Sequence, residues 1–131
     1  MMPRCIAVFL LATACGLAAD LTGIWTGQQT GRRGEPEDIA FRFKMDGPAL
    51  TGKLFGDEFD LPISEAVVEG DQIRFVITTT NYYSGTKSRF IYTGTVRGTE
   101  IELTRERVQT PEEKAANRPP FKQTITLKRL T

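Results

Sequence analysis

Residues 20–28 read DLTGIWTGQ and contain Trp25, the only tryptophan in a chain of 131 residues. The stretch opens the first of several segments rich in Thr, Val, Ile, Phe and Tyr, which are the residues that suit β-strands. The largest side chain of the protein therefore stands near the start of the first predicted strand. We interpret Trp25 as the residue that closes one end of a β-barrel.

Apolar and polar residues alternate with a period of two through most of the chain, as in Ile39-Ala40-Phe41-Arg42-Phe43. Successive side chains of a strand point to opposite faces, so each such segment has one dry and one wet side. The alternation predicts eight strands, at residues 22–29, 38–46, 49–55, 59–69, 72–80, 88–97, 100–108 and 121–130.

The connections between these strands alternate between tight and long. Three tight turns hold a glycine, at Gly47-Pro48, Gly70-Asp71 and Gly98-Thr99, and the other connections are mostly longer. In an up-and-down arrangement, the tight turns gather at one end and the long loops at the other. Closure removes the two open edges of such a sheet. The sequence therefore predicts an all-β domain that is a single eight-stranded antiparallel up-and-down barrel.

Two local signals modify this pattern. Pro62 lacks an amide hydrogen, which predicts a bulge or a break in the fourth strand. Thr110-Pro111-Glu112-Glu113 combines an N-cap residue, a proline at the first helical position and a glutamate at the third. We expect one short helical turn there.

Residues 1–19 have the features of a signal peptide, namely Arg4, a short apolar run and small residues before Asp20. The apolar run is much shorter than the ~20 residues that span a membrane. We expect cleavage before Asp20, export to the periplasm or the extracellular space, and a mature domain of residues 20–131. Thr13-Ala14-Cys15 offers an alternative, a lipid anchor at Cys15.

Charge and composition exclude several functions. Removal of Arg4 from the 17 basic residues leaves 16, which balance the 16 acidic residues, so we expect neither nucleic acid nor an anionic membrane as a partner. The chain has no histidine, which excludes Ser-His-Asp catalysis and ordinary zinc sites. We therefore expect no enzymatic activity, no catalytic residue, no metal and no cofactor, and a monomer.

Gly23-Ile24-Trp25 resembles the Gly-x-Trp motif on the first strand of lipocalins and related calycin barrels. In those families an arginine of the last strand packs over the tryptophan, and Arg129 stands at the matching position. The chain is also similar to small secreted bacterial β-barrel domains. The resemblance implies a calycin-like barrel, but residues 31–37 form a short polar connection where lipocalins carry a lid loop. A deep lipocalin cup is therefore not expected.

Five residues are candidates for ligand contact. Tyr82 and Tyr83 are adjacent aromatics in a long loop, and Arg105 follows Leu103 on the presumed inner face. Arg105 either reaches a carboxylate ligand or keeps its charged head in water at the rim. Phe75 and Tyr92 are interior aromatics.

These candidates leave two hypotheses open. One is an exported barrel that binds a small apolar or amphipathic ligand at the long-loop end. The other is a protein- or glycan-interaction module whose interior is filled by side chains. An inhibitor that inserts its N-terminal segment into an enzyme is a less favoured version, because the segment before Leu21 is short. A cavity of about 300 Å³ or more would favour ligand binding.

Overall fold

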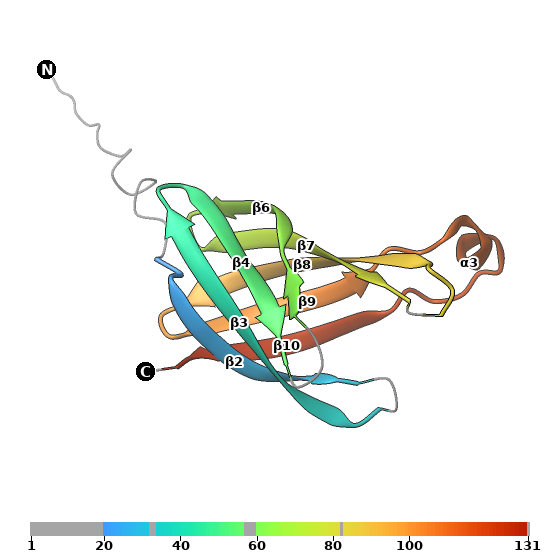
Figure 1. The fold of residues 1–131 in the computed structure, drawn as a ribbon, viewed down its shortest axis with the longest axis horizontal. Helices are drawn as coiled ribbons and strands as arrows, with labels where there is room; N and C mark the ends of the chain where they lie inside the picture. The colour runs from blue at the N-terminus through green and yellow to red at the C-terminus, as the bar shows by residue number, and fades with distance from the viewer. Residues whose placement is uncertain (1–19, 32–33, 57–59, 82, 131) are drawn as a thin grey trace, which may run out of the picture.

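The computed structural model describes residues 20–31, 34–56, 60–81 and 83–130, which form a nearly closed antiparallel β-barrel with one short helix (Figure 1). The predicted signal peptide, Cys15 and Tyr82 lie outside these residues. The elements are β2 (Gly23–Thr30), β3 (Pro36–Asp46), β4 (Ala49–Phe55), β5 (Asp60–Pro62), β6 (Ser64–Glu69), β7 (Gln72–Thr80), β8 (Lys87–Arg97), β9 (Glu100–Arg107), α3 (Pro111–Ala115) and β10 (Lys122–Arg129).

The first and last described strands are neighbours, as the barrel prediction requires. The strand order is β5-β4-β3-β2-β10-β9-β8-β7-β6. Strands β2 and β10 pair antiparallel, with Trp25 opposite Arg129 and Thr26 opposite Lys128. The first and last described strands therefore lie within the wall of the barrel and not at its open edges.

The described residues contain nine strands where the sequence predicts eight, because the predicted strand 59–69 is broken. Strand β5 ends at Pro62 and pairs with β4, whereas β6 begins at Ser64 and pairs with β7. The Ile63 amide between them donates to the Gly52 carbonyl over 3.0 Å. The break lies where the sheet closes on itself, because β5 and β6 are its two terminal strands.

The three tight turns lie where they are predicted, and each glycine has a left-handed φ, of 62° at Gly47, 61° at Gly70 and 63° at Gly98. L-residues with a Cβ rarely adopt this conformation. The Arg129 amide donates to the carbonyl of Thr99 over 2.8 Å. Arg129 and the Gly98 turn therefore lie at the same end of the barrel.

The core next to this end is filled by four aromatic rings from three strands. Phe41 and Phe43 of β3, Phe75 of β7 and Tyr92 of β8 have ring centroids 4.9–5.8 Å apart in five contacting pairs. Stacked and edge-on contacts at such distances stabilise a core beyond the burial of area alone. This half of the interior is packed and not hollow.

Helix α3 begins as the sequence predicts and is held to the barrel by an ion pair. The Thr110 hydroxyl accepts from the Glu113 amide, and the Glu113 carboxylate accepts from the Thr110 amide. Glu113 also pairs with both terminal nitrogens of Arg107. This pairing, with the Thr110 hydrogen bond second, lowers the pKa of Glu113 to about 2.

Candidate ligand-binding cavity

A cavity of about 860 Å³ opens at the long-loop end of the barrel. Its volume lies within the roughly 300–1,000 Å³ that is typical of small-molecule sites. The apolar side chains that line it are Leu54, Leu61, Ile77 and Phe90. The principal polar ones are Gln29, Glu37, Tyr92 and Arg105. The cavity wall is therefore mixed, with an apolar patch beside a larger number of polar side chains that include the carboxylates of Glu35 and Glu37.

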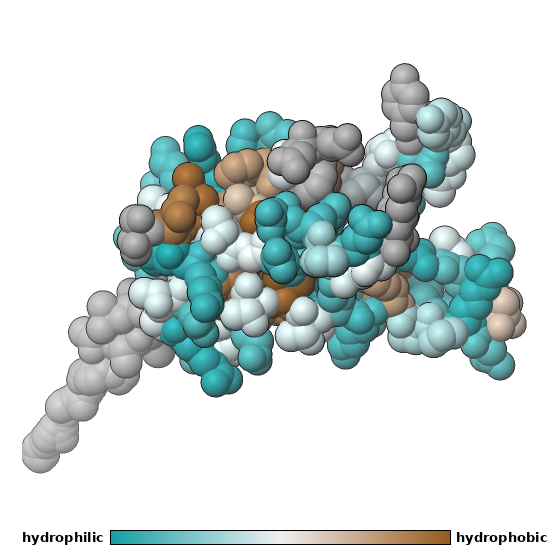
Figure 2. All heavy atoms as spheres, turned by 90° about the horizontal axis from the view of Figure 1, so that it is seen from below, coloured by the Kyte–Doolittle hydropathy of each residue, from teal (hydrophilic) through white to brown (hydrophobic). Residues whose placement is uncertain are grey.

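The cavity exists because strands at this end extend beyond the aromatic core. The β2–β3 hairpin supplies one wall, and β7, β8 and β9 supply another. In Figure 1 these elements run past the short strand β5 toward the end that carries α3. Figure 2 shows the two sides of this end as separate projections with a recess between them. A short polar connection after the first strand has thus not prevented a sizeable opening.

Arg105 of β9 is the cation that lines the cavity, whose other charged lining residues are Glu35 and Glu37. Its guanidinium carbon lies 4.2 Å from the ring centroid of Phe90 and 5.2 Å from that of Phe121. Its Nη1 donates to Gln123 Oε1 over 3.2 Å. Within the described ranges, its buried Nε has no hydrogen-bond partner, and no carboxylate forms an ion pair with it. The guanidinium is therefore held in place by aromatic rings, and its Nε donor is not used by any residue that the structure describes.

Tyr92 marks the floor of the cavity, since it also belongs to the aromatic core. Burial raises the pKa of the Tyr92 phenol, and the charge of Arg105 and a hydrogen bond from it oppose that shift. The phenol therefore stays neutral at physiological pH and contributes a hydroxyl beside the Arg105 guanidinium.

Gln29 of β2 is a polar residue of the cavity that the sequence analysis did not identify. Its side chain is 6% exposed, and its Nε2 donates to Glu37 Oε1 over 2.8 Å. Its Oε1 has no hydrogen-bond partner among the described residues. The sequence did carry a signal, because Gln29 follows Trp25 and Gly27 at intervals of two and therefore shares their inward face.

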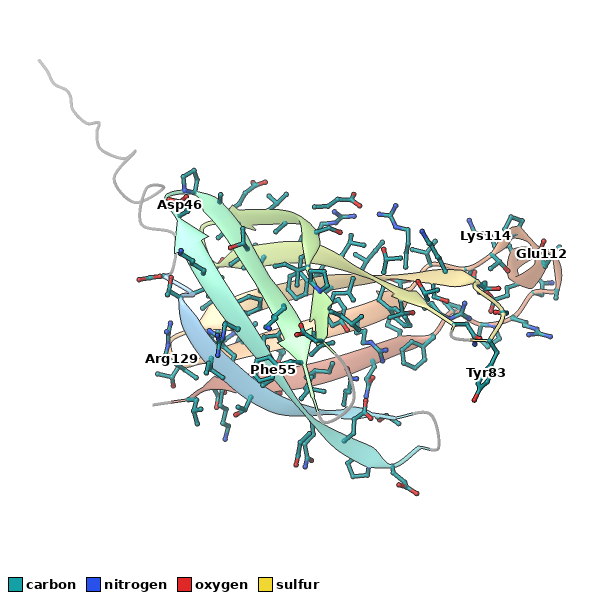
Figure 3. The ribbon with its side chains drawn as sticks, in the orientation of Figure 1. Asp46, Phe55, Tyr83, Glu112, Lys114 and Arg129 are labelled. Atoms are coloured by element: carbon teal, nitrogen blue, oxygen red, sulfur yellow. The ribbon has the colours of Figure 1, made fainter. Side chains whose placement is uncertain are left out.

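The other predicted contact residues lie apart from this cavity. Phe75 stacks beneath Tyr92, with ring centroids 4.9 Å apart, and does not line the opening. Tyr83 is 92% exposed in the β7–β8 loop and points away from the barrel (Figure 3). Tyr82 is outside the described residues. Of the five candidates, the structure brings together Arg105 and Tyr92 in the cavity wall.

The opposite end is closed by Trp25 and Arg129, and Figure 3 shows Arg129 far from Tyr83. Trp25 is fully buried, and its indole nitrogen donates to the Leu21 carbonyl over 3.0 Å. The Arg129 guanidinium lies 4.5 Å from the Trp25 ring and donates to the Thr22 carbonyl over 2.8 Å and the Asp20 carbonyl over 2.6 Å. The stacked pair thus joins residues 20–22 to the last strand.

The fold defines the class of the protein as a nearly closed antiparallel barrel, compatible with a calycin-like fold, with a cavity at one end. No family model, curated protein or solved structure gives a significant match to the chain. In the described ranges, no three His, Cys, Asp or Glu side chains are grouped to hold a metal ion. No helix in the same ranges is long and apolar enough to cross a membrane.

Proposed function

We propose that the protein is an exported, non-enzymatic barrel that binds a small amphipathic carboxylate in the cavity at its long-loop end. The observation that carries the proposal is Arg105, a cation that lines the cavity against the rings of Phe90 and Phe121 and whose buried Nε has no partner among the described residues. A charge in such surroundings is stabilised by an anion, and an arginine–carboxylate pair is among the stronger polar contacts in proteins.

The apolar patch in the cavity wall supports an amphipathic ligand over a small polar anion. Leu54, Leu61, Ile77 and Phe90 offer contact to an aliphatic chain, while Arg105 is placed to bind its acid group. Each buried CH₂ contributes about 0.8 kcal/mol, which corresponds to about a fourfold gain in affinity. Affinity for straight-chain acids should therefore rise with length until the chain fills the cavity.

The test measures binding of decanoate, decanol and decyltrimethylammonium by isothermal titration calorimetry. We expect decanoate to bind more tightly than the neutral and cationic chains. Arg105→Met should remove that preference, while Arg97→Met, at an exposed position beside the Gly98 turn, should keep it. Native mass spectrometry of the exported protein should recover a bound acid. Equal binding of the three chains by the parent protein would refute the proposal.

Export itself rests on the leader-like residues 1–19. The intact mass of the exported protein distinguishes a chain that begins at Asp20 from one that begins at a lipidated Cys15. A mass that retains residues 1–19 would contradict export by this route.

A second function is favoured by one observation, the 92% exposure of Tyr83 at the loop tip. Exposed tyrosines suit recognition of proteins or glycans, because the ring and the hydroxyl both contribute contacts. If the parent protein binds none of the chains but is retained by a glycan array, and Tyr83→Ala abolishes that retention, the interaction-module hypothesis replaces the ligand-binding one.

A further inference from the structure

The cavity wall holds a second buried polar atom that has no hydrogen-bond partner among the described residues, Gln29 Oε1. It is a hydrogen-bond acceptor, whereas Arg105 Nε is a donor. Gln29 Oε1 is buried in a side chain that is only 6% exposed, and it has no hydrogen-bond partner among the described residues. Buried polar groups in proteins are nearly always hydrogen-bonded, so each exception needs a physical reason.

The orientation of the Gln29 amide is fixed by its neighbour on β3. An ionised carboxylate only accepts hydrogen bonds, so the group that faces Glu37 must be the amide nitrogen. The observed contact, from Gln29 Nε2 to Glu37 Oε1 over 2.8 Å, satisfies this requirement. The amide oxygen is thereby left to accept from something other than Glu37.

The cavity consequently has two walls of different hydrogen-bonding character. The β2–β3 wall presents acceptors, Gln29 Oε1 and the Glu37 carboxylate, whereas the β9 wall presents the Arg105 Nε donor. An unsubstituted fatty acid satisfies the β9 wall alone. It covers the β2–β3 wall with methylene groups that cannot donate a hydrogen bond.

We infer that the ligand is a bifunctional amphipathic acid that carries, besides its carboxylate, an O–H or N–H group that donates to Gln29 Oε1. Hydroxylated acids and N-acylated amino acids belong to this class. The inference rests on the proposed function, because it assumes that the acid group lies at Arg105. Beyond the proposed function, the inference states which class of acids binds most tightly and assigns that preference to Gln29.

The experiment compares decanoate with hydroxydecanoate isomers, with N-octanoylglycine, and with the matching methoxydecanoates, which accept but cannot donate. A donor that satisfies a buried, otherwise unpaired acceptor should lower Kd by about 5- to 100-fold. We therefore expect at least one hydroxy or amide acid to bind at least about fivefold more tightly than decanoate. Its methoxy counterpart should show no such gain.

Two neighbouring glutamines provide a matched pair of variants. Gln29→Met removes the acceptor at similar size and should abolish the preference for the donor-bearing acid over decanoate. Gln28→Met is the control, because Gln28 is exposed on the opposite face of β2 and also donates to a carboxylate of β3, that of Asp38, over 2.9 Å. This control should keep the preference. Thermal melting establishes that both variants are folded.

The outcomes separate the inference from the function on which it rests. If the parent protein binds all the acids equally, or if Gln29→Met retains the preference, the inference is wrong and carboxylate binding stands. If no acid binds at all, the proposed function fails and the inference fails with it. The comparison of hydroxy with methoxy acids uses the unaltered protein, so it remains decisive even if Gln29→Met does not fold.

Discussion

Replacing Trp25 with alanine tests whether the closed end stabilises the barrel. Truncation of a buried tryptophan to alanine costs about 3–5 kcal/mol. Trp25 has 0% exposure, and its indole nitrogen is hydrogen-bonded to the Leu21 carbonyl. The Arg129 guanidinium, 4.5 Å from the ring, adds an attraction of about 0.5–2 kcal/mol. Because these terms overlap in a truncation, we expect a loss of about 4–5 kcal/mol.

The loss is measured by urea unfolding followed by circular dichroism, since the variant lacks the only tryptophan that fluorescence could follow. At about 4 °C per kcal/mol for a domain of this size, Tm should fall by about 15–20 °C. Trp25→Phe should cost less than the alanine variant, because it keeps a ring. Leu130→Ala, at a side chain 59% exposed beside the same end, should cost under about 1 kcal/mol. A loss below about 1 kcal/mol in Trp25→Ala would refute the role of the indole in closing the barrel.

Two further changes test the close approach of strands and the attachment of α3. Gly27→Ala should destabilise the protein by about 1–3 kcal/mol in urea melts, because the added Cβ would lie 2.6 Å from the Thr126 carbonyl oxygen and 2.9 Å from a Leu127 methyl carbon; an unchanged midpoint would contradict this packing. Glu113 has a pKa of about 2 in the folded protein, below the ordinary value of 4.5, so its ionised form stabilises the fold above about pH 4.5 and this contribution disappears as pH falls toward 2. The stability difference between the parent protein and Glu113→Gln should therefore shrink over that interval, and a difference independent of pH would show that the pairing with Arg107 does not stabilise the fold.

Much of the barrel could be predicted from local patterns. The period of two places Phe41 and Phe43 on the inner face, and the glycine turn at Gly98 joins two strands as expected. The break after Pro62 follows from the missing amide hydrogen, and the helix after Thr110 follows from its capping residues. These features depend on interactions between residues that are close in the sequence, so they can be predicted without the tertiary structure.

The candidate site could be predicted only in part. The alternation of inward and outward side chains along a strand, together with the charge, identified Arg105. The same alternation could have identified Gln29. Alternation and charge do not show what surrounds a side chain. The aromatic partner Phe121 precedes the last strand, and it reaches Arg105 only because β10 pairs with β9. Phe75 and Tyr92 both point into the barrel, but Tyr92 lines the cavity whereas Phe75 lies below it.

By itself, the sequence determined that this chain forms antiparallel strands with tight turns at one end, because strand periodicity and turn conformation are local properties of the backbone. Only the tertiary structure decided that the interior is filled beside Trp25 and open beside Arg105. The volume enclosed depends on how far each strand extends past the aromatic core, and on how side chains from strands distant in sequence share that space. Whether Gln29 and Arg105 line one cavity is a consequence of that packing, which no single segment specifies.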